Sequence, residues 1–380
     1  MQPGTVVIDR VGLGDLIQAL SGRGYRTLGP VVRDGAIGHG EISGTGDLPE
    51  GYHEEQGPGS YRLHHDGDGA LFEWAVGPTS WKPTFFPPRE TVWRTATDNG
   101  RPVFQEPPSD PAPVALLGAR PCELAAIRVL DRTLADGPVA DPGYTGRRAA
   151  SFVVVAECGT PASTCFCTSM KTGPAATDGY DLALTELPGP YGNHQYLIRA
   201  GSEKGAEVLE EIPHRAASPE DLTRRDEVIT SATNRMSRTL DTDDLPALLA
   251  RNLEHPRWSE VADRCLSCGN CTMVCPTCFC SDVDDVSDLT GTIERHRTWS
   301  SCFDRAHSYI HGGSLRPTTS SCYRQWLTHK LSTWWDQFDT SGCVGCGRCI
   351  TWCPVGIDLT DEAAAIRASD GLKPEDGDHV

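Results

Sequence analysis

The stretch CLSCGNCTMVCP at residues 265–276 decides the fold of this chain, and CVGCGRCITWCP at residues 343–354 repeats it. Both follow the pattern C-x₂-C-x₂-C-x₃-C-P. Three closely spaced thiolates bind three irons of one cubane, while the backbone between them turns its N–H groups toward the sulfides. The fourth cysteine leaves toward a second cubane, and the proline after it ends the turn because it has no N–H to donate. The pattern therefore predicts two 4Fe–4S clusters.

In such repeats the ligands cross over, so that each motif gives its last cysteine to the other cluster. The first cluster is expected to be bound by Cys265, Cys268, Cys271 and Cys353. The second cluster is expected to be bound by Cys343, Cys346, Cys349 and Cys275. The alternative is a pair of zinc sites, but these usually show separated C-x₂-C pairs and not a triplet followed by C-P.

The composition of the chain limits the classes of partner and the cellular compartment that can be expected. The chain has 380 residues and a formal net charge of −18, so neither nucleic acid nor an anionic membrane surface is expected as a partner. No apolar run approaches the ~20 residues of a membrane span, and the N-terminus lacks a basic stretch followed by an apolar one. We therefore expect a cytoplasmic protein, in which the 16 cysteines are metal ligands and not disulfides.

Apolar patterning predicts an α+β chain: an N-terminal α/β domain followed by a mostly helical, two-cluster ferredoxin-like domain. The first ~110 residues are rich in Gly, Pro, Asp and Thr and are typical of strands and turns, without helices. Further strands are expected at 114–118, 151–156 and 196–198, with a helix that begins at Pro121. Helices are expected at 245–253, 258–262, 323–338 and 363–368. The predicted domains are 1–235 and 240–370, with a flexible tail at 371–380.

Eight further cysteines fall outside the two motifs. Four of them lie in the α/β part and are candidate ligands of a third iron–sulfur cluster: Cys122, Cys158, Cys165 and Cys167. Their spacing matches no standard run, so buried or redox-active thiols are the alternative. The role of the other four stays open: Cys278, Cys280, Cys302 and Cys322.

No catalytic machinery is evident in the sequence. We find no nucleophile–base pair, and Gly12-x-Gly14 lacks the third glycine of a dinucleotide fingerprint and its strand–helix context. We therefore expect no flavin or NAD(P) on this chain alone. Cysteine-ligated clusters without substrate machinery indicate a non-catalytic subunit that transfers electrons for other proteins.

At several motifs the sequence resembles the beta subunits of cytoplasmic NAD(P)-linked NiFe hydrogenases, also called sulfhydrogenases. The resemblance covers most of the chain and rests on the segments 77–82, 86–88, 118–127, 164–170, 265–280, 323–331 and 342–358. It implies a complex with delta and alpha subunits, which carry further clusters and the NiFe site, and with a flavin-bearing gamma subunit that handles NAD(P)H. In that complex the beta subunit would relay electrons.

The equivalent subunit of anaerobic sulfite reductase is similar to the same family, so it is the alternative assignment within redox proteins. The signature segments favour the hydrogenase. From another class, a zinc-stabilised interaction protein without a redox role is the remaining alternative. The choice of NAD or NADP, the cluster potentials and the direction of electron flow are not encoded in any motif, because hydrogen bonds and burial around a cluster set its potential.

Overall fold

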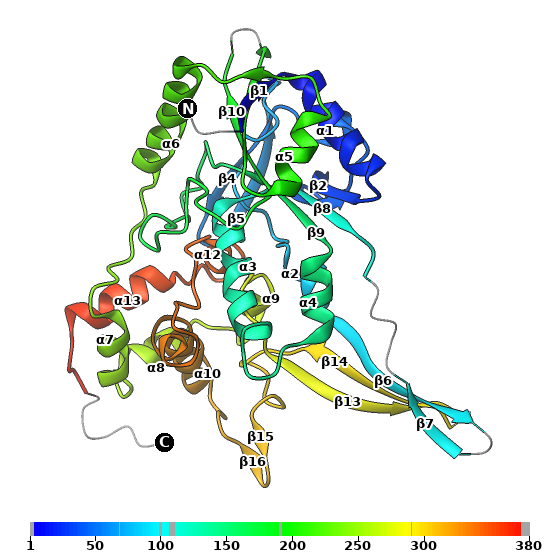
Figure 1. Ribbon diagram of the computed structural model, residues 1–380. Coiled ribbons are helices and arrows are strands. Elements are labelled where there is room, and N and C mark those ends of the chain that lie inside the picture. The colour runs from blue at the N-terminus through cyan, green and yellow to red at the C-terminus, as the bar shows by residue number, and fades with distance from the viewer. Residues whose placement is uncertain are drawn as a thin grey trace.

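The computed structural model describes residues 4–67, 69–98, 101–105, 111–189, 192–289 and 291–373. In Figure 1 a twisted sheet with flanking helices forms the upper half, and a group of short helices forms the lower half. A narrow β arm projects from the lower half. The chain is thus mixed α+β, as the sequence predicts.

The upper half is organised around one eight-stranded sheet. Its order is β12 (Arg215–Ala216), β1 (Thr5–Ile8), β11 (Gln195–Ala200), β10 (Leu182–Leu187), β9 (Ser151–Ala156), β8 (Val114–Ala119), β2 (Arg26–Arg33) and β3 (Ala36–Glu41). The four strands β10, β9, β8 and β2 run parallel. The remaining strands pair antiparallel.

Helices cover this sheet, as a largely parallel sheet requires. They are α1 (Arg10–Gly22), α3 (Pro121–Leu134), α4 (Pro142–Ala149), α5 (Glu203–Glu210) and α6 (Pro219–Arg235). All six residues of β9 are buried. Phe152 and Val154 join the core that contains α1, whereas Val153 and Val155 join the core that contains α3. The sheet therefore has an apolar layer on each face, and α3 begins at the end of β8 that faces the lower half (Figure 1).

The expectation of strands and turns only in the first ~110 residues is wrong, because α1 is a helix of 13 residues. Its three glycines lower helix propensity by up to about 1 kcal/mol each. Four apolar side chains at helical spacing outweigh that cost by burial: Leu13, Leu16, Ile17 and Leu20. Since β1 precedes α1 directly, Gly12 does follow a strand, but it lies inside the helix and not in a phosphate-binding turn. This region also contains the hairpin of β4 (Tyr52–Gly57) and β5 (Ser60–His65) and the short α2 (Lys82–Phe85).

The lower half is helical, as predicted. It contains α7 (Leu245–Arg251), α8 (Arg257–Ala262), α9 (Asn270–Met273), α10 (Thr319–Thr328), α11 (Trp334–Phe338), α12 (Arg348–Thr351) and α13 (Leu359–Ala368). A π-helical turn, His329–Thr333, joins α10 to α11. The predicted helix at 323–338 is therefore confirmed, and Trp326, Lys330 and Trp334 are all buried along it.

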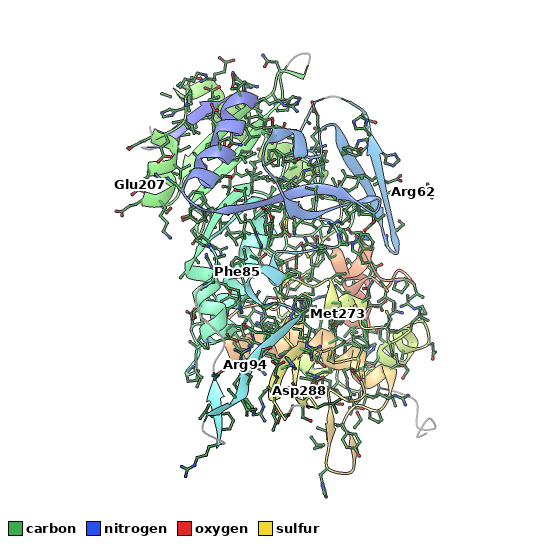
Figure 2. All side chains as sticks on the ribbon, turned by 90° about the vertical axis from the view of Figure 1, so that its right-hand side faces the viewer. Arg62, Phe85, Arg94, Glu207, Met273 and Asp288 are labelled. Atoms are coloured by element: carbon green, nitrogen blue, oxygen red, sulfur yellow. The ribbon has the colours of Figure 1, made fainter. Side chains whose placement is uncertain are left out.

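The β arm brings together segments that are distant in the sequence. Its order is β13 (Ser281–Ser287), β14 (Ile293–Trp299), β6 (Arg89–Asp98) and β7 (Arg101–Gln105), and β15 (Tyr309–Ile310) pairs with β16 (Gly313–Ser314) nearby. Arg94 and Asp288 mark this arm in Figure 2. Because β6 pairs with β14, the arm links the two predicted domains; their division at 235–240 stays a prediction.

Residues 374–380 of the predicted tail lie outside the described residues. Among the residues that are described, no helix combines the length and the apolar character needed to cross a membrane.

Candidate metal centre

The two cysteine motifs fold in the same way. Ser267 and Gly345 occupy equivalent positions and both have positive φ, of 51° and 66°. Two residues later Gly269 and Gly347 again have positive φ, and each is followed by one helical turn, α9 or α12. Positive φ turns the chain sharply enough for three cysteines to face a common point.

In each motif the first sulfur accepts a backbone N–H from within the turn. The N–H of Ser267 lies 3.4 Å from Cys265 Sγ, and that of Gly345 lies 3.5 Å from Cys343 Sγ. Hydrogen bonds of this kind favour a thiolate, which is the form that binds metal. The short helices α9 and α12 also pack against each other, which brings the two motifs side by side.

The first cavity collects cysteines from both motifs. A cavity of about 30 Å³ is lined by Cys265, Cys268 and Cys271 together with Cys353 and Cys349. Burial, followed by the nearby thiols of Cys302, Cys265 and Cys353, raises the pKa of Cys271. The last cysteine of the second motif therefore lies beside the first three of the first motif.

The second group has the reciprocal composition. Burial raises the pKa of the Cys349 thiol, and the thiols of Cys343, Cys346 and Cys275 raise it further, in that order. Burial likewise raises the pKa of Cys343 to about 12. Cys275, the last cysteine of the first motif, is thus a near neighbour of the second motif.

A buried lysine stands beside this second group. Lys330 Nζ is 3.2 Å from Cys275 Sγ, 3.5 Å from Cys278 Sγ and 3.1 Å from the carbonyl oxygen of Gly342. A hydrogen bond with Cys278, helped by the Lys330 charge, holds the pKa of Cys275 well below its ordinary value despite burial. The sequence patterns assigned Lys330 no role, although its place among apolar residues on one helical face was a usable signal.

The third set of predicted ligands also converges. A cavity of about 20 Å³ is lined by Cys122, Cys158, Cys165 and Cys167, and also by Cys346 of the second motif. Cys122 lies in the first turn of α3, Cys158 follows β9, and the other two lie in the loop after it. Burial raises the pKa of Cys167 to about 12.

The remaining four cysteines make separate contacts. Cys278 contacts Lys330, and Cys322 Sγ lies 3.5 Å from the carbonyl oxygen of Arg316. Burial, and then the charge of Cys280, raises the pKa of Cys302 to about 12. Their roles stay open.

Within the described ranges, no three His, Cys, Asp or Glu side chains are grouped so as to hold a single metal ion. A cubane is bound differently, because each of its thiolates bonds to a different iron.

Comparisons with known proteins identify the class to which the two cysteine motifs belong. Residues 264–357 match a family described as a 4Fe-4S dicluster domain. The fold and the site thus define an iron–sulfur protein. The chain is also similar to sulfhydrogenase 2 subunit beta of Pyrococcus furiosus, with 34% identity over 246 residues. The matched region spans 64% of this chain and 71% of that protein. It belongs to the family of sulfhydrogenase beta subunits. No solved structure matches the chain.

Proposed function

We propose that this chain is the iron–sulfur electron-transfer subunit of a multi-subunit NAD(P)-linked NiFe hydrogenase. The observation that carries this proposal is that Cys353 lines the cavity of the first motif while Cys275 is a neighbour of the second. Two cubanes held side by side by one chain suit a relay, because a 4Fe–4S cluster takes up and releases one electron at a time.

The ligands we propose are those expected from the spacing. One cluster takes Cys265, Cys268, Cys271 and Cys353, and the other takes Cys343, Cys346, Cys349 and Cys275. Cys349, a proposed ligand of the second cluster, also lines the cavity of the first. Burial raises its pKa, and so do the neighbouring thiols of Cys343, Cys346 and Cys275. The two proposed clusters are therefore close neighbours.

The partners we propose are a flavin-bearing gamma subunit that uses NAD or NADP and a delta–alpha pair that carries the NiFe site, in the cytoplasm. The name of the Pyrococcus relative supports membership in a sulfhydrogenase complex. It favours a hydrogenase over the sulfite reductase alternative. We propose no flavin or NAD(P) site on this chain itself.

Two measurements test the proposal. Anaerobically prepared protein should contain at least eight irons with matching sulfide, about four per cubane, and dithionite should reduce it to an EPR-active form. Zinc in place of iron would support the interaction-protein alternative and contradict the redox role. Native purification should recover hydrogenase subunits, whereas recovery of a sulfite reductase would support the other alternative.

The isolated chain should neither oxidise H₂ nor turn over NAD(P)H. Robust activity without partners would show that a catalytic site exists on this chain.

A further inference from the structure

Four cysteines of the α/β half, all outside residues 264–357, line a cavity that also reaches Cys346 of the second motif. We propose that this cavity holds a third 4Fe–4S cluster, bound by Cys122, Cys158, Cys165 and Cys167. This site extends the proposed function, but either proposal can fail without the other, because the third cluster would add irons to the eight of the dicluster domain.

The first argument is space. The side chains of four cysteines line one cavity of about 20 Å³, so their sulfurs can approach a common point. Three of the four side chains are no more than 7% exposed: Cys122, Cys165 and Cys167. The volume of this cavity is close to the 30 Å³ of the cavity at the first cysteine motif, so the two groups of thiols leave similar space between them.

The second argument is charge. The Arg120 side chain lines the cavity and is 1% exposed. Its guanidinium donates only to backbone carbonyls in the described residues, those of Phe72, Trp74, Ala156 and Glu157. Its buried Nε has no hydrogen-bond partner there.

A buried cation is costly unless an anion compensates it. Two carboxyls interact with the Arg120 charge, Glu54 and Glu186, and burial raises the pKa of both, that of Glu54 to about 7. A cubane with four thiolate ligands has a net negative charge, and it would lie against Arg120. Cys122, in the first turn of the 14-residue α3, adds the positive end of that helix to the same side. The cavity is therefore lined both with soft sulfur donors and with positive charge.

The third argument is the contact with the second motif. The N–H of Phe166 donates to the carbonyl of Gly345 at 2.9 Å, and Thr172 Oγ1 donates to that of Val344 at 2.6 Å. Both bonds tie the loop that carries the last two thiols to the turn of the second motif.

The turn at 343–349 borders both cavities, since Cys346 lines this one and Cys349 lines the first. This position puts the cluster of the second motif between the other two, in a relay of three.

The test is the iron content of the full chain, prepared anaerobically. The wild-type protein should carry about twelve irons, four per cubane, and native mass spectrometry should show three clusters. Cys122→Ala and Cys165→Ala should each lose about four irons and keep the EPR signals of the dicluster pair. Cys322→Ala is the matched control, since it also removes a buried thiol but should keep all the irons.

Several outcomes would overturn the proposal. A wild-type chain with about eight irons, enough for two cubanes, excludes the third cluster and leaves the dicluster function intact, whatever the variants do. An unchanged iron content in both Cys122→Ala and Cys165→Ala would place the extra cluster elsewhere. Should the alanine variants fail to fold by circular dichroism, Cys158→Ser at the half-buried position is the milder variant. It should give a labile or three-iron third cluster, and an unchanged spectrum from folded Cys158→Ser protein would count against the site.

Discussion

The motif at 265–276 lies near the surface, whereas the equivalent motif at 343–354 is enclosed by the rest of the chain. Cys268 is exposed and Leu266 is 63% exposed, while Cys343 and Cys346 are each only 9% exposed. Lys330 donates to the carbonyl of Gly342, directly before the enclosed motif, and the loop at 165–172 donates to the carbonyls of Val344 and Gly345 within it. Twelve residues of nearly the same pattern therefore meet two different environments.

This difference separates two properties of an iron–sulfur site. Ligand spacing sets the kind of cluster, because the turn that gathers the thiols is local. Burial and nearby charge set access and potential, because both depend on residues that are distant in the sequence. The exposed motif is suited to exchange electrons with a partner, and the enclosed motif is suited to pass them on inside the chain.

The largest expected effect concerns crossed ligation. Cys275→Ser should alter the cluster of the second motif, and Cys353→Ser that of the first, because a serine oxygen is a harder and poorer ligand than a thiolate. EPR spectra of Cys346→Ser and Cys268→Ser identify the two clusters. A Cys275→Ser spectrum equal to that of Cys268→Ser would mean that each motif binds its own cluster.

The next largest effect is expected when the residues at the equivalent turn positions, Ser267 and Gly345, are each replaced by the other's residue type. A Cβ on Gly345 would lie 2.7 Å from Cys167 Cα, so Gly345→Ser should destabilise the holoprotein by about 2–4 kcal/mol. Ser267→Gly should change stability by less than about 1 kcal/mol, because relief of the positive φ offsets the lost hydrogen bond to Thr319. Anaerobic thermal unfolding measures both. Equal effects would mean that the two turns are equally free of their surroundings.

Lys330→Met should lower the reduction potential of the second-motif cluster, because the ammonium group beside Cys275 stabilises the more negative, reduced state. A charged hydrogen bond of about 1.5–3 kcal/mol, partly redox-dependent, corresponds to a shift on the order of 50 mV for one electron. EPR-monitored redox titration checks it. The exposed Lys204→Met variant should leave both potentials unchanged, and an unchanged potential in Lys330→Met would refute the role of this charge.

The smallest effect is expected at the surface of the first motif. Leu266→Asp should leave the iron content unchanged but weaken binding to the partner subunit by up to about tenfold, since a buried apolar contact would be replaced by a charge. Leu289→Asp is the control, because Leu289 is equally apolar and fully exposed on the arm. Binding of the purified variants to the partner distinguishes the two. Equal losses would argue against a docking role for the face beside Cys268.

Much of the fold follows from local patterns. The strand Ser151–Ala156 is an unbroken apolar run, and the helix that starts at Pro121 has apolar residues at helical spacing, so both were predictable and both are confirmed. Helix α1 was missed because its glycines conceal a buried apolar stripe. Its stability comes from packing on the sheet, which no local propensity reports.

Some features of the candidate site also follow from the sequence, whereas others depend on the tertiary structure. The charge on Arg120 can be read from the sequence, but its burial without a hydrogen-bonded carboxylate cannot. The four cysteines between residues 122 and 167 show no standard spacing, and only the arrangement of α3, β9 and the following loop brings them around one cavity. Their ligand role stays a proposal.

By itself, the sequence determined the iron–sulfur character of this protein, because the spacing C-x₂-C-x₂-C-x₃-C-P places thiolates within one turn of chain and needs no distant residue. Only the tertiary structure decided which motif is enclosed, that Lys330 meets Cys275 and that Cys346 borders a third group of thiols. The physical reason is that these contacts join segments far apart in the chain. Their closeness depends on how the sheet and the helices pack as a whole.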